Sequence, residues 1–205
     1  MPAYTASAAQ SKPKVETQIG RRLRALRKGR ELSVTELAAR ANVSVGMISQ
    51  IERSLSNPSV RTLERLRLAL AVPLTALLED GKARRDTQDE RQLVRKGDER
   101  PFFHVGNQGV TKELLSPSGD HDLQMMIILL PAGASSADVL IGEGEKAGLV
   151  LSGAVVIDVA GQRAMLSEGD SFQFRSTLPH SVHNESSQEA RILWVMNTKQ
   201  PTTHL

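Results

Sequence analysis

Hydrophobic positions in the first third of the chain recur at intervals of three and four residues, the spacing of amphipathic helices. The pattern predicts a helix from about Thr17 to Gly29, a pair of short helices over 34–41 and 45–53, and a fourth helix after Ser59. Pro73 can open a last short helix, because proline is tolerated in the first helical turn. Since such short segments are marginal alone, we expect the five helices to share one core.

Polar residues with specific local geometry mark the ends of the two middle helices. Ser33 precedes the first of them and has Glu36 three residues later, which is the sequence of a capping box. Asn42 tolerates the left-handed conformation that a sharp turn requires, and Ser44 can cap the next helix. The positions expected to face inward after the turn are Val43, Ile51 and either Met47 or Ile48.

The outer face of the segment 45–53 carries side chains that can read base edges. Gln50 can pair bidentately with adenine, Ser49 can donate or accept, and Val45 can contact a thymine methyl group. The pattern by itself fits either a DNA recognition helix or an ordinary helical hairpin with a solvated polar face. The expected DNA contacts are Arg21, Arg24, Thr35, Ser44, Val45, Gly46, Ser49, Gln50, Arg53 and Asn57.

Charge is distributed unevenly along the chain. The 205 residues carry a net charge of +3, but residues 17–78 hold eleven basic and four acidic side chains, a net of +7, and residues 79–205 carry −5. Charge alone would also fit a solvated surface. Because the basic segment contains the helix pair, the asymmetry favours binding of the first part to a polyanion such as DNA.

Four motifs in residues 19–78 resemble the Cro/repressor-type (XRE-family) regulators. They are LSxxELA from Leu32, VSxxxISQIER from Val43, NPSxxTL from Asn57 and a closing ALxVPLxxLL. The resemblance implies a five-helix, lambda-repressor-like helix-turn-helix domain that binds a double-stranded DNA operator as a homodimer. Val34 departs from the pattern, because many relatives carry there a glutamine that braces the recognition helix against a phosphate.

After Leu93 the pattern changes to short β-branched or alternating runs, separated by glycine, proline, asparagine and aspartate. Many short strands with such turns predict a β-sandwich or small barrel, with turns at 160–161 and 168–170. Residues 79–92 have few apolar positions and are expected to be a linker. The domains predicted are therefore a disordered tail (1–16), a helix-turn-helix domain (17–78), this linker, and a β domain (93–205).

Two motifs in the β domain resemble the cupin family. They are GLVLSG at 148–153 and GDSFQFRSTLPHSVHN at 169–184. The resemblance implies an all-β double-stranded β-helix (jelly-roll) barrel, and hence an α+β protein of two domains. The order of the two domains, together with NQGVTKELLS at 107–116 and the terminal PTTHL, is similar to the putrescine-responsive repressors.

Metal-using cupins hold their ion with two histidines and a glutamate of the first motif and a histidine of the second, ligands suited to iron, manganese, zinc or nickel. Here no histidine lies between His121 and His180. Gly142 stands at an expected histidine position and Lys146 at that of the glutamate, and a protonated lysine offers no lone pair. We therefore expect no metal, no cofactor and no catalytic residue. The alternative is a metal-dependent enzyme, because some proteins with the same two domains are iron-dependent epoxidases acting on phosphonates.

These observations predict a DNA-binding repressor whose cupin domain senses a small metabolite, with an amine or amino acid expected from the resemblance. The residues expected to contact this effector, unless they are simply barrel core, are Met126, Glu143, Lys146, His180 and Trp194. Cysteine is absent, which fits a reducing cytoplasm. The longest apolar run, Met125–Leu130, is too short to span a bilayer, so we expect no membrane partner.

Overall fold

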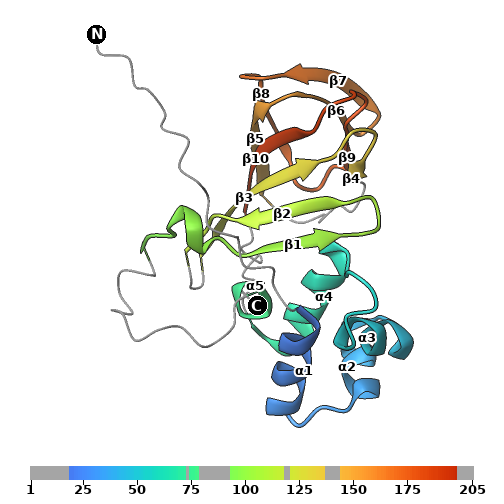
Figure 1. The fold of residues 1–205 in the computed structure, drawn as a ribbon. Coiled ribbons are helices and arrows are strands. Elements are labelled where there is room, and N and C mark those ends of the chain that lie inside the picture. Colours follow the sequence, from blue (N-terminus) through green and yellow to red (C-terminus); the bar gives the residue numbers. More distant parts are fainter. Residues whose placement is uncertain (1–18, 73, 79–92, 118–120, 137–143, 198–205) are drawn as a thin grey trace, which may run out of the picture.

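The computed structural model describes residues 19–72, 74–78, 93–117, 121–136 and 144–197, with a helical domain below a β domain (Figure 1). The two-domain α+β architecture is confirmed. The expected tail and linker, the N-terminal start at Thr17, and Pro73 lie outside the described residues. The helices are α1 (Ile19–Gly29), α2 (Val34–Ala41), α3 (Val45–Glu52), α4 (Val60–Leu70) and α5 (Leu74–Leu78). In the described part of the chain, no helix has the length and apolar character needed to cross a membrane.

The caps that the sequence predicts around α2 and α3 are present. Ser33 Oγ accepts a hydrogen bond from the Glu36 amide (3.1 Å), and the Glu36 carboxylate accepts one from the Ser33 amide (2.7 Å). Asn42 closes α2 in the left-handed region (φ 51°, ψ 51°), and Ser44 Oγ accepts from the Met47 amide. Of the two candidates for the inward position, Ile48 is fully buried whereas Met47 is 38% exposed.

Helices α1 and α3 approach each other closely at Gly20. A Cβ atom at this position would lie 2.0 Å from the Ile51 carbonyl oxygen, so only glycine fits without displacing α3. At the next residue of α3, Glu52 accepts from Arg27 Nε (2.6 Å) and Nη2 (2.9 Å), and Arg27 Nη1 donates to the Leu32 carbonyl (2.7 Å). The two side chains are 9% and 8% exposed. This buried pair fixes the position of α3 relative to α1.

The β domain is built from two antiparallel sheets that face each other. One has the order β1-β2-β3-β10-β5-β8 and the other β4-β9-β6-β7. The strands are β1 (Phe102–Val105), β2 (Val110–Leu114), β3 (Leu123–Leu130), β4 (Ser135–Ser136), β5 (Glu145–Ser152), β6 (Ala154–Val159), β7 (Gln162–Ser167), β8 (Ser171–Arg175), β9 (His180–His183) and β10 (Ala190–Asn197). Their facing sides enclose a mainly aliphatic interior, as in a small jelly-roll barrel.

The start of the β domain differs from the expected one. The run that begins at Leu93 predicts a strand, but β1 begins only at Phe102 and a 3-10 turn occupies Gly97–Glu99. Leu93 and Val94 are 81% and 51% exposed. The segment between them and β1 is charged and contains a glycine, so it has no apolar face to bury in a sheet. By contrast, the expected turn at 160–161 is present, with both residues at positive φ (53° and 85°) as a two-residue hairpin requires.

The β1–β2 hairpin belongs to the hydrophobic core of the helical domain as well as to its own sheet. Phe103, Val105 and Leu114 lie in the same cluster of buried apolar side chains as the leucines of α4 and α5. Figure 1 shows the hairpin lying between the helices and the rest of the barrel. The two domains are therefore joined by packed side chains.

We predict that Gly20→Ala lowers the free energy of unfolding of the helical domain by about 2 kcal/mol, because the added methyl group forces α1 and α3 apart. Urea unfolding followed by far-UV circular dichroism measures the change. Gly29→Ala is the matched control, since a Cβ atom there meets no atom within 4 Å. Equal losses from both substitutions would contradict the close approach of the two helices.

Candidate functional site

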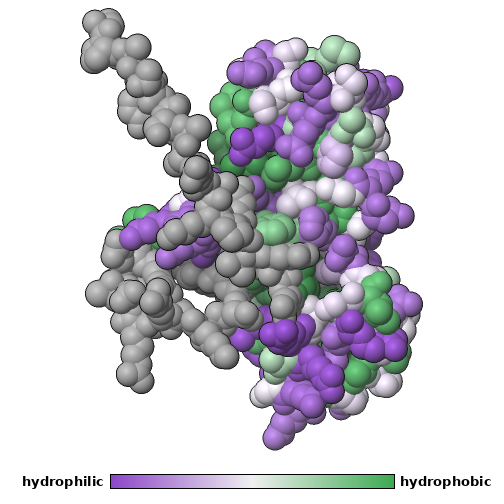
Figure 2. Space-filling model, in the orientation of Figure 1, coloured by the Kyte–Doolittle hydropathy of each residue, from purple (hydrophilic) through white to green (hydrophobic). Residues whose placement is uncertain are grey.

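The outer stripe of α3 is open to solvent. Val45 is 44% exposed, Gly46 and Gln50 are exposed, and Ser49 is half-buried. These positions and Arg53 follow the helical repeat and so share one side of α3, opposite the buried Ile48. The remaining residues expected at DNA are exposed as well: Arg21, Arg24, Thr35, Ser44 and Asn57. Figure 2 shows hydrophilic residues over much of the helical domain on the face drawn.

Some basic residues of the helical domain donate hydrogen bonds to backbone carbonyls of other helical segments, whereas others stay exposed to solvent. Arg22 Nε donates to the Ala76 carbonyl (2.8 Å) and Arg65 Nη1 to the Asn42 carbonyl (3.0 Å), so these two brace the helices. Arg53 stays exposed, with Nε donating to the Ser49 carbonyl (3.1 Å). Arg27 is buried. The charge count therefore overstates how many cations of the helical domain can face a phosphate backbone.

A polar cluster lies inside the barrel, where the sequence predicts the effector contacts. Lys146 on β5 and His180 on β9 meet from opposite sheets, with 3.1 Å between Nζ and Nε2. The two residues are only 3% and 9% exposed, and Lys112 and Gln124 are buried as well. We call Lys112, Gln124, Lys146 and His180 the interior polar cluster.

Hydrogen bonding and burial together define the charge state of this cluster. His180 Nδ1 lies 2.8 Å from the Leu178 carbonyl oxygen and donates to it, so Nε2 accepts from Lys146. Burial, assisted by the nearby Lys146 and Lys112, lowers the pKa of His180 to about 4, against the opposing hydrogen bond to Leu178. Burial first and Lys112 second lower the pKa of Lys146 to about 8. At neutral pH the histidine is uncharged and the lysine is mostly protonated.

Aromatic rings form the wall beside the cluster. The Trp194 ring stacks on His180 with 5.9 Å between centroids, and Phe174 meets His180 edge-on at 4.6 Å. Phe172 contacts Trp194 at 5.1 Å. Gly148 makes room for Phe172, because a Cβ atom there would lie 2.3 Å from the end of that ring.

The structure therefore brings together Met126, Lys146, His180 and Trp194, all of which are buried. Met126 is the β3 partner of Trp194 in the antiparallel register. Glu143 lies outside the described residues. Sequence reasoning missed Lys112, Gln124, Phe172 and Phe174. The alternation of side chains along β2, β3 and β8 indicates which of these residues share a face of their strand. It does not indicate which face points inward, because that depends on the sheet pairing.

The residues around His180 do not fit a metal cation. No group of three or more histidine, cysteine, aspartate or glutamate side chains that could hold a metal occurs among the described residues. The direct neighbour of His180 Nε2 is an ammonium group, which repels a cation. His183 lies on the other side of β9, where its Nε2 is 2.7 Å from Ser181 Oγ. The two histidines thus cannot share an ion.

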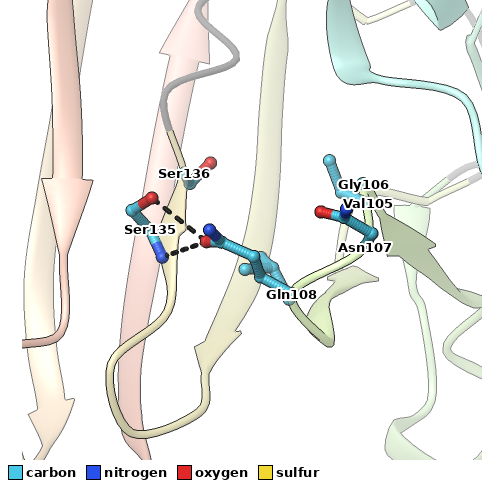
Figure 3. A pocket seen from close by; sticks show the side chains of 7 residues that line it. Val105, Gly106, Asn107, Gln108, Ser135 and Ser136 are labelled. Carbon is cyan, nitrogen blue, oxygen red and sulfur yellow. Dashed lines mark hydrogen bonds between the residues drawn. The ribbon is translucent and has the colours of Figure 1, made fainter.

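A separate surface cavity of about 260 Å³ lies where the β1–β2 turn meets β4 (Figure 3). Gln108 Oε1 reaches across it and accepts from the amide (2.8 Å) and hydroxyl (3.1 Å) of Ser135. Its lining contains no charged side chain; the residues are Val105, Gly106, Asn107, Gln108, Val110, Ser135 and Ser136. This contact ties the turn to the second sheet and offers little for binding an ionic molecule.

Comparisons with known proteins agree with both domains. A helix-turn-helix family model matches residues 23–77 and a cupin domain model matches residues 126–196. Both segments lie within the expected domains, whose outer bounds stay predictions.

One relative and one solved structure each match 90% of the chain, and a second relative matches a shorter part. The HTH-type transcriptional regulator PuuR of Escherichia coli is 28% identical over 90% of this chain and 95% of its own length. The regulator SinR of Bacillus subtilis is 37% identical over 37% of this chain and 66% of its own length. A crystal structure of a helix-turn-helix family transcriptional regulator from Vibrio cholerae, 24% identical, covers 90% of this chain and 97% of its own with a TM-score of 0.61. The protein is an XRE-type helix-turn-helix transcriptional regulator with a C-terminal cupin domain.

Proposed function

We propose that this DNA-binding regulator represses transcription as a homodimer and is released from its operator by a small molecule bound at the interior polar cluster. The observation that carries the sensing role is the cluster itself. Barrel interiors of this size are filled with apolar side chains or hold one small ligand. Buried polar groups such as Lys146 and His180 are costly to bury, and groups with shifted pKa values inside a fold are candidates for a binding site.

DNA reading is proposed to occur through the exposed stripe of α3. Gln50 and Ser49 would meet base edges in the major groove, and Val45 would contact a thymine methyl group. Arg21 and Arg24 on α1 would contact phosphates, which set the register of the protein on the duplex without reading its sequence. Because each recognition helix covers one half-site, a two-fold pair of chains is the arrangement proposed at the operator. This role places the protein in the cytoplasm with the DNA.

The β1–β2 hairpin is the proposed connection between ligand and DNA. Lys112 on β2 belongs to the interior polar cluster, and Leu114, two residues later on the same strand, lies in the core shared with α4 and α5. A ligand that draws Lys112 toward it would shift β2 and thereby change how Leu114 packs against α4 and α5. Such a shift changes operator affinity only if the ligand binds one arrangement of the helices more tightly than the other.

Catalysis by a metal centre is not part of the proposal, because the direct neighbour of His180 Nε2 is the Lys146 ammonium group, which offers a metal no lone pair. The relatives over most of the chain are named as transcriptional regulators. The effector class proposed from the resemblance is an amine or amino acid.

Gln50→Ala is expected to weaken binding to an operator selected from a random duplex library by about 1–3 kcal/mol, with little change on unselected DNA. Fluorescence anisotropy at fixed salt gives both affinities. Equal losses on the two DNAs would show that Gln50 does not read bases.

Arg24→Ala is expected to lower affinity for both DNAs alike and to reduce the slope of log K against log salt by about 1, because one phosphate contact is lost. Arg163→Ala is the matched control, an exposed arginine on β7 of the barrel. A salt slope that stays at the wild-type value in Arg24→Ala would remove that residue from the interface.

Acidification is expected to destabilise the β domain partly through His180. Its folded-state pKa of about 4 lies below the ordinary 6.5, so the unfolded chain takes up the proton first. The contribution of a neutral His180 is therefore complete above about pH 6.5 and is lost as the pH falls toward about 4. Thermal unfolding across this range should show a shallower fall in His180→Gln than in the wild type. Parallel curves would mean that His180 can be protonated in the folded barrel.

Elemental analysis tests the alternative of a metal-dependent enzyme. We expect the purified protein to carry no stoichiometric iron, manganese, zinc or nickel, and His180→Ala to leave the trace content unchanged. One transition-metal ion per chain that disappears in His180→Ala would favour the enzyme.

A further inference from the structure

We infer that two copies of this chain pair through the outer face of the six-stranded sheet, the face turned away from the barrel interior. This inference rests on the proposed function, because that function requires two copies at the operator, and it assigns the surface that joins them. We call this surface the outer apolar face. Its residues are the outward apolar side chains of β3, β5 and β10: Leu123, Met125, Ile127, Leu129, Ala147, Leu149, Leu193 and Val195.

The central strands of this sheet are apolar on both faces. Along β10, buried and half-buried residues alternate, and the buried Ile192, Trp194 and Met196 belong to the barrel core. Leu193 and Val195 lie between them and point to the other side, yet they are apolar too. An antiparallel sheet with one face in water alternates apolar and polar residues, so this pattern indicates a sheet that is covered on both faces.

The sheet pairing places the side chains of the outer apolar face next to one another. Two rows cross the three strands, Ile127–Leu193–Leu149 and Met125–Val195–Ala147. Leu123 is 57% and Met125 39% exposed, and all the others except Ile127 are half-buried. In the described part of the chain, none of the eight belongs to either hydrophobic core. Figure 2 shows hydrophobic surface along the side of the barrel where Figure 1 places β5 and β8. Contiguous apolar surface of this kind marks an interaction site.

The size of the sheet is sufficient for a pair of chains. Strands β3, β5 and β10 have eight residues each, and β8 has five. With about 4.8 Å between strands and about 3.3 Å per residue, four strands present on the order of 500 Å² per copy, and two facing copies cover on the order of 1,000 Å². That area reaches the size expected of a specific interface.

Composition favours a second copy over the chain's own ends as the cover. Residues 1–18 and 198–205 together hold one leucine and one valine, and neither isoleucine nor phenylalanine. Such segments have little apolar surface to set against eight apolar side chains. A second copy presents the same apolar residues, and a two-fold contact places one patch against itself. Two sheets packed face to face in this way form an apolar layer between them.

The polar rim of the face suits two identical chains. Arg175 of β8 and Glu145 of β5 are partners in the register, and the Gln173 side-chain amide donates to Glu145. Both signs of charge therefore occur at this edge, so two copies do not meet with one sign only. At the other end of β10, Arg191 lies beside Leu129, and its buried Nε has no hydrogen-bond partner in the described part of the chain. An acceptor on the second copy would satisfy this donor.

The outer apolar face lies on the reverse side of strands that hold the proposed sensing site. Trp194 points inward between the outward Leu193 and Val195, and Gln124 points inward between Leu123 and Met125. A ligand that shifts these strands from inside changes both of their faces together, because protein interiors are close-packed. Pairing through this sheet would thus connect the state of the barrel to the spacing of the two recognition helices.

The first test is sedimentation velocity of the full chain over a range of concentrations. We expect a dimer, and we expect Met125→Glu to weaken it about a hundredfold or more, because each pair of copies would bury two carboxylates. Met165→Glu is the matched control: it makes the same change on β7 of the other sheet, where Met165 is 73% exposed. A monomeric wild type, a dimer unchanged in Met125→Glu, or equal dissociation of both variants would overturn the inference.

A second measurement avoids a disruptive substitution. The chain has no cysteine, so Met125→Cys and Met165→Cys each carry a single thiol. Alkylation of the thiol in Met125→Cys is expected to be slow in the dimer and to accelerate on dilution to the monomer, whereas Met165→Cys reacts at one rate throughout. A thiol in Met125→Cys that reacts equally fast at all concentrations contradicts the pairing surface. One that stays protected in the monomer contradicts it as well, because a segment of the same chain would then cover the face.

Operator binding separates this inference from the proposed function. Met125→Glu should lower affinity for a complete selected operator and leave affinity for a single half-site unchanged, because α3 is untouched. A chain that pairs through the outer apolar face but does not discriminate its selected operator from random duplex would refute the regulatory function and leave the interface standing. A chain that reads its operator and pairs equally well in Met125→Glu would do the reverse.

Discussion

The packing of the β1–β2 hairpin against the last two helices is the contact on which a regulatory role depends. Phe103, Val105 and Leu114 are buried among leucines of α4 and α5. A flexible connection would let the barrel change without consequence for α3. Because the interiors of proteins are close-packed, a displacement of β2 must instead be absorbed by its neighbours on both sides.

A second constraint holds the DNA-reading surface in place. The recognition helix has only eight residues and would not be stable alone. It is positioned from behind by Ile48 and Ile51, by the close approach at Gly20, and by the buried pair of Arg27 with Glu52. Removing one member of a buried ion pair is more damaging than removing an exposed one, because the other charge stays desolvated. The outer face of α3 can thus carry polar side chains while the packing of its inner face holds the helix in position.

The barrel illustrates how a fold associated with metal sites can serve another chemistry. His180 occupies its place in the second cupin motif, yet its partner across the interior is an ammonium group at 3.1 Å. A protonated lysine beside His180 offers no lone pair to a metal ion. The site is still small, buried and walled by rings, so the physical demands on a ligand are specific even without a metal.

The sequence by itself determined the caps of α2 and α3, the two-residue turn at 160–161 and the outward stripe of α3. Each of these depends on neighbours within four or five residues, such as Ser33 with Glu36 or Asn42 at a left-handed position. Motifs in both halves also specified the two domains and their order. Four of the five expected effector residues are buried in the barrel. Lys146 and His180 were named from the motif resemblance, and Met126 and Trp194 from strand patterns.

Only the tertiary structure decided which residues from distant segments meet. Arg27 was only one of eleven basic residues in a charge count until Glu52 was placed beside it, and Lys112 had no visible role before β2 was paired with β3. Local patterns cannot predict such contacts, because the partners are separated by tens of residues. Whether they meet depends on sheet order and helix packing. For the same reason the contact of Lys146 with His180, unlike the net charge of the chain, could not be read from the sequence.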